Sequence, residues 1–286
     1  MSNVAIVTGT STGLGEAIAV MMAGQGIKTY ATMRNVAKAS DRLRALAVAG
    51  KVTLLALDVQ NTESVEGAVA QVIAAEGKVD ILVNNAGAGY VRTTEQSTED
   101  DVNWVMDVNF HGVLRCTKAV LPHMRKARHG HVINISSVGG LVGQPFNEVY
   151  CAAKFAVEGY TESLASYVQP SFNVKFSLVE PGGIQSEFAK SALAHFHQTG
   201  GMLDDEYQPI LAKYIGGAAA RAQSSEDSGT FQTSEEVAEI VLAVAGNANP
   251  PLRIRTSDWA ENFTAIKTQA DPDGTVSCNA VTQKFL

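Results

Sequence analysis

The sequence has few cysteines, no long apolar run and no visible targeting segment. Its three cysteines, Cys116, Cys151 and Cys278, show no paired spacing, so we expect reduced thiols and no disulfide framework. No uninterrupted apolar segment reaches the roughly 18 residues that a membrane-spanning helix needs. The N-terminus runs directly into an apolar strand, without a basic segment or a cleavable hydrophobic run. We therefore expect a cytoplasmic protein that does not enter a membrane.

Positive charge is also scarce. The chain has 22 Lys and Arg against 29 Asp and Glu, a net charge of -7. This balance argues against nucleic acid or an anionic membrane surface as the main partner. With 286 residues, 45% of them apolar, the chain can bury one large core, so we expect a single domain over residues 1–286.

Short apolar strands alternate with helical patterns over the first 180 residues. Such alternation predicts parallel strands joined by helical crossovers. The expected fold class is α/β, a single Rossmann-type doubly wound parallel sheet of about seven strands with helices on both faces. The predicted strands are 3–8, 27–32, 52–57, 81–83, 132–136, 173–179 and 252–256, and the predicted helices are 13–26, 36–48, 62–75, 100–128 with a break near 108–110, and a helix that carries Tyr150 to about 168.

The alternation stops after Pro181. We expect residues of about 186–232 to form a partly helical, mobile cover over a substrate site, because insertions of this length are usually functional or disordered. Residues 218–234 lack periodicity and predict a loop, and residues of about 257–286 form a C-terminal extension. One helical stripe is expected in the cover, made of Tyr207, Ile210, Leu211, Tyr214 and Ile215.

The stretch from Ser136 to Lys154 carries the strongest chemical signal. Tyr150 and Lys154 are four residues apart and share one face of a helix. The lysine charge favours the phenolate and is expected to lower the tyrosine pKa towards neutrality. Ser137, at the end of a predicted strand, offers a hydroxyl for a substrate oxygen. A packed helical tyrosine without a chemical role is the alternative.

A glycine-rich loop, TGTSTGLG, lies between the first strand and the first helix, with Gly9, Gly13 and Gly15. Glycines let the backbone approach a pyrophosphate, and the helix N-terminus offers unpaired N–H groups. At the end of the second strand, where a carboxylate would favour NAD(H), stands Met33 followed by Arg34. A guanidinium matches a 2′-phosphate, so NADP(H) is predicted, with NAD(H) possible. The alternatives are a plain strand-to-helix turn and a solvated Arg34.

Four features coincide: TGTSTGLG, the NNAG of residues 84–87, Ser137, and Tyr150-x-x-x-Lys154. Together they resemble the short-chain dehydrogenase/reductase superfamily, strongly over residues 3 to about 190. The runs GGLVGQPFNEVYCAAKFAVEGYTESLA and ATMRN further resemble the subgroup around 17β-hydroxysteroid dehydrogenase type 1 and retinol dehydrogenases.

The resemblance implies roles for matching positions. Asp58 matches the acid at the adenine amino group, and Asn109 matches a helix-kinking asparagine that positions a water in a proton relay. Ser186 stands where the family usually has a threonine for the carboxamide. The remaining implied cofactor contacts are Gly9, Ser11, Thr12, Gly13, Leu14, Gly15, Val59, Asn85, Ala86, Gly87, Tyr150, Lys154, Pro181, Gly182 and Ile184.

The implied reaction is hydride transfer between nicotinamide C4 and a carbonyl carbon. Tyr150 handles the proton, Ser137 hydrogen-bonds the oxygen, and Lys154 tunes Tyr150 and binds the ribose. Apolar cover residues suggest a bulky ketone or secondary alcohol, such as an aryl ketone, steroid or retinoid. The expected substrate wall is Ser137, Gly139, Val142, Gln144, Phe146, Val149, Gly183 and Phe188.

The same residues leave two other classes of protein open. A cofactor-binding sensor would be expected to lack the tyrosine or lysine, and a redox-neutral enzyme to have changed the glycine loop or the lysine. His195 and His197 have no third ligand nearby, so no metal is expected. His129 and His131 are predicted at the surface. By resemblance alone, a homodimer or homotetramer is expected through helices of about 109–128 and 150–168.

Overall fold

The computed structural model describes residues 2–221, 231–276 and 279. Its centre is a seven-stranded sheet in the order β3-β2-β1-β4-β5-β6-β9, with every neighbouring pair parallel. The reversal of strand order at β1 and β4 makes this a doubly wound sheet, as predicted. The strands are β1 (Val4–Thr8), β2 (Lys28–Met33), β3 (Val52–Ala56), β4 (Ile81–Asn84), β5 (Gly130–Ile135), β6 (Val174–Glu180) and β9 (Arg253–Arg255).

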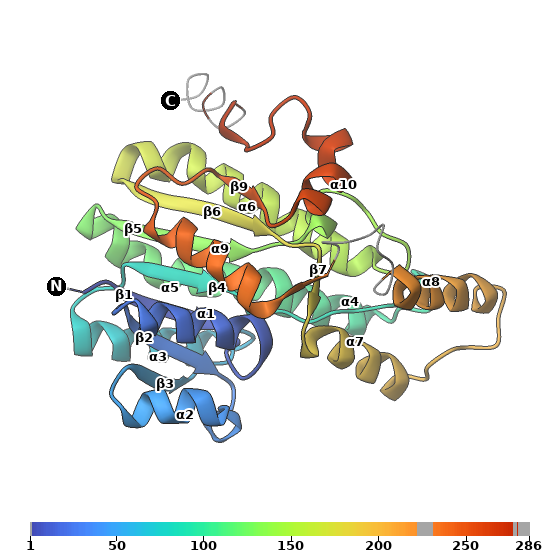
Figure 1. Ribbon diagram of the computed structural model, residues 1–286, viewed down its shortest axis with the longest axis horizontal. Coiled ribbons are helices and arrows are strands. Elements are labelled where there is room, and N and C mark those ends of the chain that lie inside the picture. Colours follow the sequence, from blue (N-terminus) through green and yellow to red (C-terminus); the bar gives the residue numbers. More distant parts are fainter. Residues whose placement is uncertain (1, 222–230, 277–278, 280–286) are drawn as a thin grey trace.

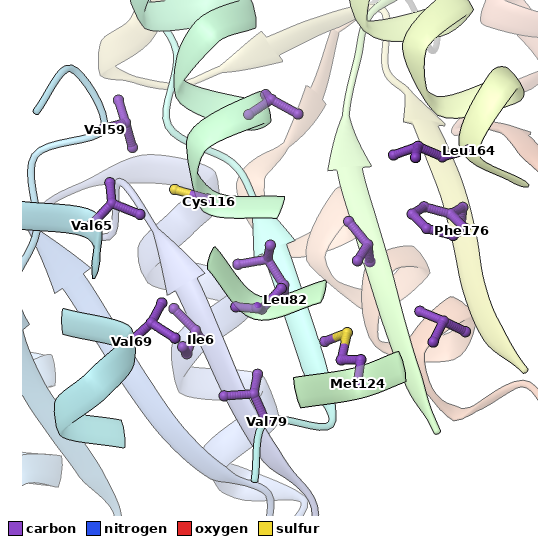
Figure 2. Packing of buried hydrophobic residues seen from close by; sticks show 14 of the residues in the cluster. Ile6, Val59, Val65, Val69, Val79, Leu82, Cys116, Met124, Leu164 and Phe176 are labelled. Atoms are coloured by element: carbon purple, nitrogen blue, oxygen red, sulfur yellow. The ribbon is translucent and has the colours of Figure 1, made fainter. Parts of the chain in front are cut away.

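Helices cover both faces of the sheet (Figure 1). Helices α1 (Gly13–Gly24) and α9 (Ser234–Gly246) pack together on one face, and α3 (Thr62–Glu76), α5 (Gly112–Ala127) and α6 (Glu148–Phe172) cover the other. Because both faces are covered, β1 and β5 are buried along their whole length. Figure 2 shows the core between the sheet and the second helix layer, where Ile6 and Leu82 meet Val69 and Met124.

Local sequence explains where these helices start and stop. The Asn61 side chain accepts from Ser64 N at the start of α3, and Gly77, at φ 74°, ends it in the left-handed region. The predicted helix over 36–48 is two elements instead, a 3₁₀ turn (Val36–Lys38) and α2 (Asp41–Val48). Ser40 caps α2 by accepting from Leu43 N, which fixes the boundary between them.

The predicted break near 108–110 is present. Helix α4 (Glu99–Met106) continues into a π-helical segment, Asp107–His111, and then into α5. A π segment holds one extra residue per turn and is frequent at functional sites. No helix among the described residues is both long and apolar enough to span a bilayer.

The cover consists of α7 (Glu187–Gln198) and α8 (Gln208–Arg221), which lie beyond the carboxyl ends of the central strands (Figure 1). A small parallel pair, β7 (Gly183–Gln185) and β8 (Phe231–Thr233), joins it to α9. The loop predicted over 218–234 is therefore wrong at both ends, where helix and strand form; residues 222–230 lie outside the described residues. Ile210 is 56% exposed and does not belong to the buried stripe.

Ionic contacts of Arg253 and Arg255 hold β9 to its neighbours. Arg253 Nε donates to Glu158 Oε2 at 3.0 Å, and its Nη2 donates to Glu162 at 2.5 Å. Arg255 pairs with Glu180 and with Glu261. The two arginines of β9 thus connect this strand to α6, β6 and α10 (Asp258–Thr268). Burial raises the pKa of both Glu158 and Glu180.

Candidate active site

Tyr150 and Lys154 lie one turn apart near the start of α6, as predicted. The Lys154 ammonium is 5.7 Å from the centroid of the Tyr150 ring and donates to the Ile135 carbonyl at 2.9 Å. Because Ile135 ends β5, this bond fixes α6 to the carboxyl edge of the sheet. Lys154 is 4% exposed and Tyr150 is partly buried, so the pair lies in a low-dielectric site.

The electrostatics differ from the prediction for Tyr150. Burial raises the pKa of the phenol to about 12, against a lowering effect of its hydrogen bond with Ser137. Burial also lowers the pKa of the Lys154 ammonium to about 8, which the negative charge of Glu158 opposes. The expected net lowering of the Tyr150 pKa by Lys154 is therefore wrong in this structure, because burial of the phenol raises its pKa more than the hydrogen bond with Ser137 lowers it.

Ser137 follows β5 in an extended conformation, and its Oγ accepts from Gly139 N at 3.0 Å. Val138 N donates to the carbonyl of Pro181 at 3.0 Å. This bond places the Pro181–Gly182 turn, after β6, next to the segment that carries Ser137. Two strand ends thus deliver their site residues to one edge of the sheet, which is where ligands bind in doubly wound folds.

Asn109 is fully buried in the π-helical segment. Its Nδ2 donates to the carbonyls of Ala88 and Val105, both at 2.9 Å, and its Oδ1 accepts from Ala88 N at 3.1 Å. A Cβ on Gly87 would lie 3.0 Å from Asn109 Oδ1 and 3.8 Å from Lys154 Nζ. The amide and the ammonium therefore flank the same glycine.

The glycine loop has the shape that a pyrophosphate needs. Gly9 and Gly13 have φ of 69° and 61°, and a Cβ on Gly15 would lie 2.3 Å from the Gly9 carbonyl oxygen. Thr12 precedes α1 without a side-chain cap, so the N–H groups of the first turn have no cap from it. Asn85 Nδ2 donates to the carbonyls of Thr8 and Gly9 at 2.9 and 3.1 Å, which holds the loop against β4. The residues present fit a dinucleotide.

Arg34 and Asp58 stand at the next two strand ends. Met33 ends β2, and its carbonyl accepts from Leu57 N at 3.0 Å. Arg34 follows Met33 and Asp58 follows Leu57, so the two residues leave neighbouring strands next to each other. Arg34 is exposed, while the Asp58 backbone N–H donates to Ser64 Oγ at 3.0 Å. Both lie at the edge that carries the glycine loop, because Thr10 N donates to the Thr32 carbonyl at 3.0 Å.

The other predicted cofactor residues fall into two groups. Ser186 caps α7 through Phe188 N and lies beside Gly13, since a Cβ there would be 3.3 Å from Ser186 Cβ. Ala86 lies 2.8 Å from a Cβ built on Gly9, so the NNAG segment touches the glycine loop directly. Three apolar residues pack in or against the core: Leu14, Val59 and Ile184. Ser11 and Gly182 lie partly buried in the connecting loops.

Part of the expected substrate wall lies near Tyr150 and Ser137. The Phe188 ring centroid is 5.9 Å from that of Tyr150. A Cβ on Gly139 would lie 3.3 Å from Ser137 Oγ and 3.6 Å from Gln144 Nε2. Val142 is partly buried on the same turn, and Gly183 begins β7 after the Pro181–Gly182 turn.

Two wall residues have another place. Phe146 has φ of 61° and is 5% exposed, because its ring turns into a cluster with Phe196 and Leu211 of the cover. Val149 packs against Tyr90 and Val105. Phe146 therefore has little surface left for a substrate, whereas the place of Val149 in the substrate wall stays a prediction. The surface prediction for His131 is also wrong, since it is 5% exposed and its Nε2 lies 2.9 Å from Ser177 Oγ.

Sequence reasoning missed two buried charged residues near the site. Glu158 is one turn beyond Lys154 on α6, and this i, i+4 spacing was the available signal. Arg92, in the loop after β4, is 4% exposed and bonds to the cover. Nothing in its sequence context singles it out. Among the described residues, no group of three or more His, Cys, Asp or Glu could hold a metal ion.

Chemically, the site can bind a carbonyl or hydroxyl oxygen and move its proton. Ser137 and Tyr150 both present hydroxyl groups, and Lys154 and Asn109 continue the polar path into the protein. A nicotinamide cofactor, when bound, supplies or accepts the hydride. Gly9, Gly13, Gly15 and Asn85 would hold its phosphates and the edge of the cleft.

Comparison with known proteins identifies the same family that the sequence motifs resemble. The family model described as short chain dehydrogenase matches residues 3–195. A 3-ketodihydrosphingosine reductase of Bacteroides thetaiotaomicron is 46% identical over 183 residues, 64% of each chain. Retinol dehydrogenase 8 of Bos taurus is 37% identical over 95% of this chain and 86% of its own. Human 17-beta-hydroxysteroid dehydrogenase type 1 is 39% identical over 89% of this chain and 77% of its own.

Solved structures agree in fold. A short-chain dehydrogenase from Streptomyces avermitilis matches with a TM-score of 0.78 at 28% identity, over 100% of this chain and 99% of its own. A Burkholderia phymatum enzyme in complex with NAD (TM-score 0.77, 25% identity, 94% and 95% covered) and an actinorhodin polyketide ketoreductase with NADPH (0.74, 28%, 89% and 95%) are also similar. The chain belongs to the short-chain dehydrogenase family, as an oxidoreductase that acts on CH–OH groups and falls in the subgroup of the steroid and retinol dehydrogenases.

Proposed function

We propose that the protein is an NADP(H)-dependent carbonyl reductase and secondary alcohol dehydrogenase for bulky, largely apolar ketones. The observation that carries this proposal is the meeting of Ser137, Tyr150 and Lys154 at one sheet edge with the Phe188 ring 5.9 Å from Tyr150. An apolar ring beside the proton donor favours an apolar substrate flank. The named activities of the steroid and retinol relatives support the same class.

In the reducing direction, Tyr150 donates its proton to the substrate oxygen as general acid. Its raised pKa keeps it protonated and ready to donate at neutral pH. Ser137 hydrogen-bonds the same oxygen, where negative charge develops. Lys154 then stabilises the resulting phenolate, and a proton from solvent returns to Tyr150 through a water that Asn109 would position beside Gly87.

The preference for NADP(H) rests on Arg34. It follows β2 directly, is exposed, and has no acidic residue before it at the strand end. A guanidinium there can pair with a 2′-phosphate, whereas a carboxylate would repel it. The runner-up is an NAD(H)-dependent dehydrogenase with the same catalytic residues.

One experiment tests both parts. Purified protein and its Arg34→Asp variant are assayed with NADPH and NADH against aryl ketones, steroid ketones, a retinoid aldehyde and small ketones, and nicotinamide absorbance is followed. We expect turnover of bulky ketones with NADPH, and a shift of the NADPH-to-NADH ratio of kcat/KM towards NADH by about tenfold or more in the variant. An unchanged ratio would refute the role of Arg34. Tight NADPH binding without any turnover would indicate a sensor.

We also propose a homodimer or homotetramer. Grooves of about 720 and 340 Å³ flank α5 and are lined largely by apolar side chains of α3, α5 and α6. A second copy would cover them. Sedimentation velocity measures this directly, and a monomer at micromolar concentration would contradict it.

A further inference from the structure

Arg92 is a buried arginine, and among the described residues every hydrogen-bond acceptor of its guanidinium is a neutral oxygen atom. Its Nη1 donates to the Gly201 carbonyl at 2.6 Å, and its Nη2 donates to the carbonyls of Phe196 and Thr199 at 3.1 and 2.8 Å. The guanidinium carbon also lies 4.5 Å from the centre of the Phe196 ring. Within the described part of the chain, no carboxylate is within ion-pair distance of it.

These acceptors form the C-terminal end of α7. The last carbonyls of a helix lack partners within the helix and carry the negative end of its dipole. Gly200 and Gly201, at φ 111° and 64°, turn the chain so that a further carbonyl faces the same guanidinium. The planar guanidinium of arginine has five N–H donors and can bond several such carbonyls at once. A lysine ammonium is a compact point charge with three donors and cannot reach the same set of acceptors.

The backbone of Arg92 ties a second segment to this point. Its N–H donates to the Phe146 carbonyl at 2.9 Å, and a β-bridge joins it to Asn147. Asn147 in turn donates to the Tyr214 hydroxyl of α8 at 2.8 Å. Phe146, held at a positive φ, packs on Phe196. One residue thus connects the segment between Ser137 and Tyr150 with both cover helices.

The other end of α7 lies at the reacting group. Phe188, in its first turn, is the residue that approaches Tyr150. A Cβ on Gly89 would lie 2.8 Å from Ala192 Cβ and 3.0 Å from Phe188 Cε1, so the inner face of α7 rests closely on the loop after β4. Because a 12-residue helix is about 18 Å long and stiff, its anchored end fixes the position of Phe188.

We propose that Arg92 is a positioning residue for the reaction: by holding the C-terminal end of α7, it fixes Phe188 at Tyr150 and sets the affinity for bulky substrates. This inference rests on the proposed function. On this proposal α7 is a fixed wall of the site, whereas the sequence predicted a mobile cover.

The test compares Arg92→Met, which keeps an apolar stem, with Arg92→Lys, and uses Arg44→Met as the matched control. Arg44 also donates to a carbonyl, that of Ala37, but from α2. Three quantities are measured: KM and kcat for one bulky and one small ketone, the Kd of NADPH by fluorescence, and the rate of tryptic cleavage at Lys190 in α7, mapped by mass spectrometry.

For Arg92→Met we expect KM for the bulky ketone to rise by about tenfold or more, with kcat less affected, an unchanged NADPH Kd and faster cleavage at Lys190. Arg92→Lys should fall between it and the wild type, and Arg44→Met should match the wild type. Equal losses for both ketones and for NADPH, or an unchanged KM with unchanged cleavage, would overturn the inference.

Two safeguards keep the result interpretable. If Arg92→Met does not fold, the same measurements on Arg92→Lys and Thr199→Val test the proposal. Thr199→Val removes the hydroxyl that accepts from Arg92 Nη2 at 3.0 Å. If the wild type reduces no ketone, the proposed function fails on its own. The cleavage rate at Lys190 then still tests the anchoring by Arg92, and an unchanged rate in Arg92→Met contradicts it.

Discussion

The cofactor side and the substrate side of this site are built by different means. On the cofactor side, from β1 to the NNAG segment, the backbone conformation forms the site. Gly9 and Gly13 have positive φ, and Gly15 has no Cβ, so the helix start can lie against Gly9 and Asn85. On the substrate side, the long side chain of Arg92 reaches across the chain to the C-terminal end of α7, and Asn147 reaches Tyr214 of α8. The first design depends on what glycine permits, and the second on particular distant partners.

This difference predicts how substitutions divide. Changes in the glycine loop should affect cofactor affinity and leave the cover in place, whereas changes at Arg92 should do the reverse. Tyr150 lies where the two sides meet, because its helix carries Lys154 on one side and its ring faces Phe188 on the other.

The largest effect is expected for Tyr150→Phe. Loss of the hydroxyl removes the proton donor, so kcat should fall by roughly 10²- to 10⁴-fold. NADPH affinity and tryptic cleavage at Lys190 should stay near wild-type values, because neither side loses its supports. Steady-state kinetics and fluorescence titration measure this. Residual activity within tenfold of the wild type would show that another group moves the proton.

The same difference explains what the sequence could predict. The strand and helix order, the π-helical break around Asn109 and the neighbours Ser137, Tyr150 and Lys154 follow from local patterns, because parallel strands deliver their ends to one edge. The position of Phe146 did not follow, since its positive φ and its cover contacts depend on residues 50 to 65 positions away. Arg92 and its acceptors are separated by more than 100 positions.

The pKa of Tyr150 shows a second limit. Spacing places Lys154 beside it, but the pKa of the phenol depends on how deeply the fold buries the ring and on its hydrogen bond with Ser137. The ionic contacts of Arg253 with Glu158 and Glu162 were likewise out of reach, because a strand near the C-terminus supplies the partner for α6.

A smaller, one-sided effect is expected for Gly15→Ala. Its Cβ would lie 2.3 Å from the Gly9 carbonyl and 2.4 Å from Asn85 Nδ2, so the loop must move. We expect the NADPH Kd to rise by about tenfold or more, while cleavage at Lys190 stays unchanged. Gly67→Ala is the control: it lies within α3 with nothing within 4 Å and should stabilise the protein by about 0.5–1 kcal/mol. An unchanged Kd for Gly15→Ala would show that the shape of the glycine loop does not set the affinity for the cofactor.

The smallest effect concerns the sheet that supports both sides. Burial lowers the pKa of His131 from 6.5 to about 3, so the folded protein keeps this ring neutral. Between these values the unfolded chain binds one more proton than the folded chain, and the free energy of unfolding therefore falls as pH falls below about 6.5. From pH 7 to pH 5 the loss from this group is about 2 kcal/mol.

His131→Gln should remove that pH-dependent loss, although it also disturbs the contact with Ser177 and lowers stability at pH 7. Urea unfolding at pH 7 and pH 5 measures the difference, with the exposed His123→Gln as control. At pH 7, NADPH affinity and cleavage at Lys190 should remain as in the wild type, because the start of β5 lies at the opposite end of the sheet from the site (Figure 1). Equal pH slopes in the variant and the wild type would place the acid sensitivity elsewhere, and faster cleavage at Lys190 would mean that the cover depends on the sheet more than on Arg92.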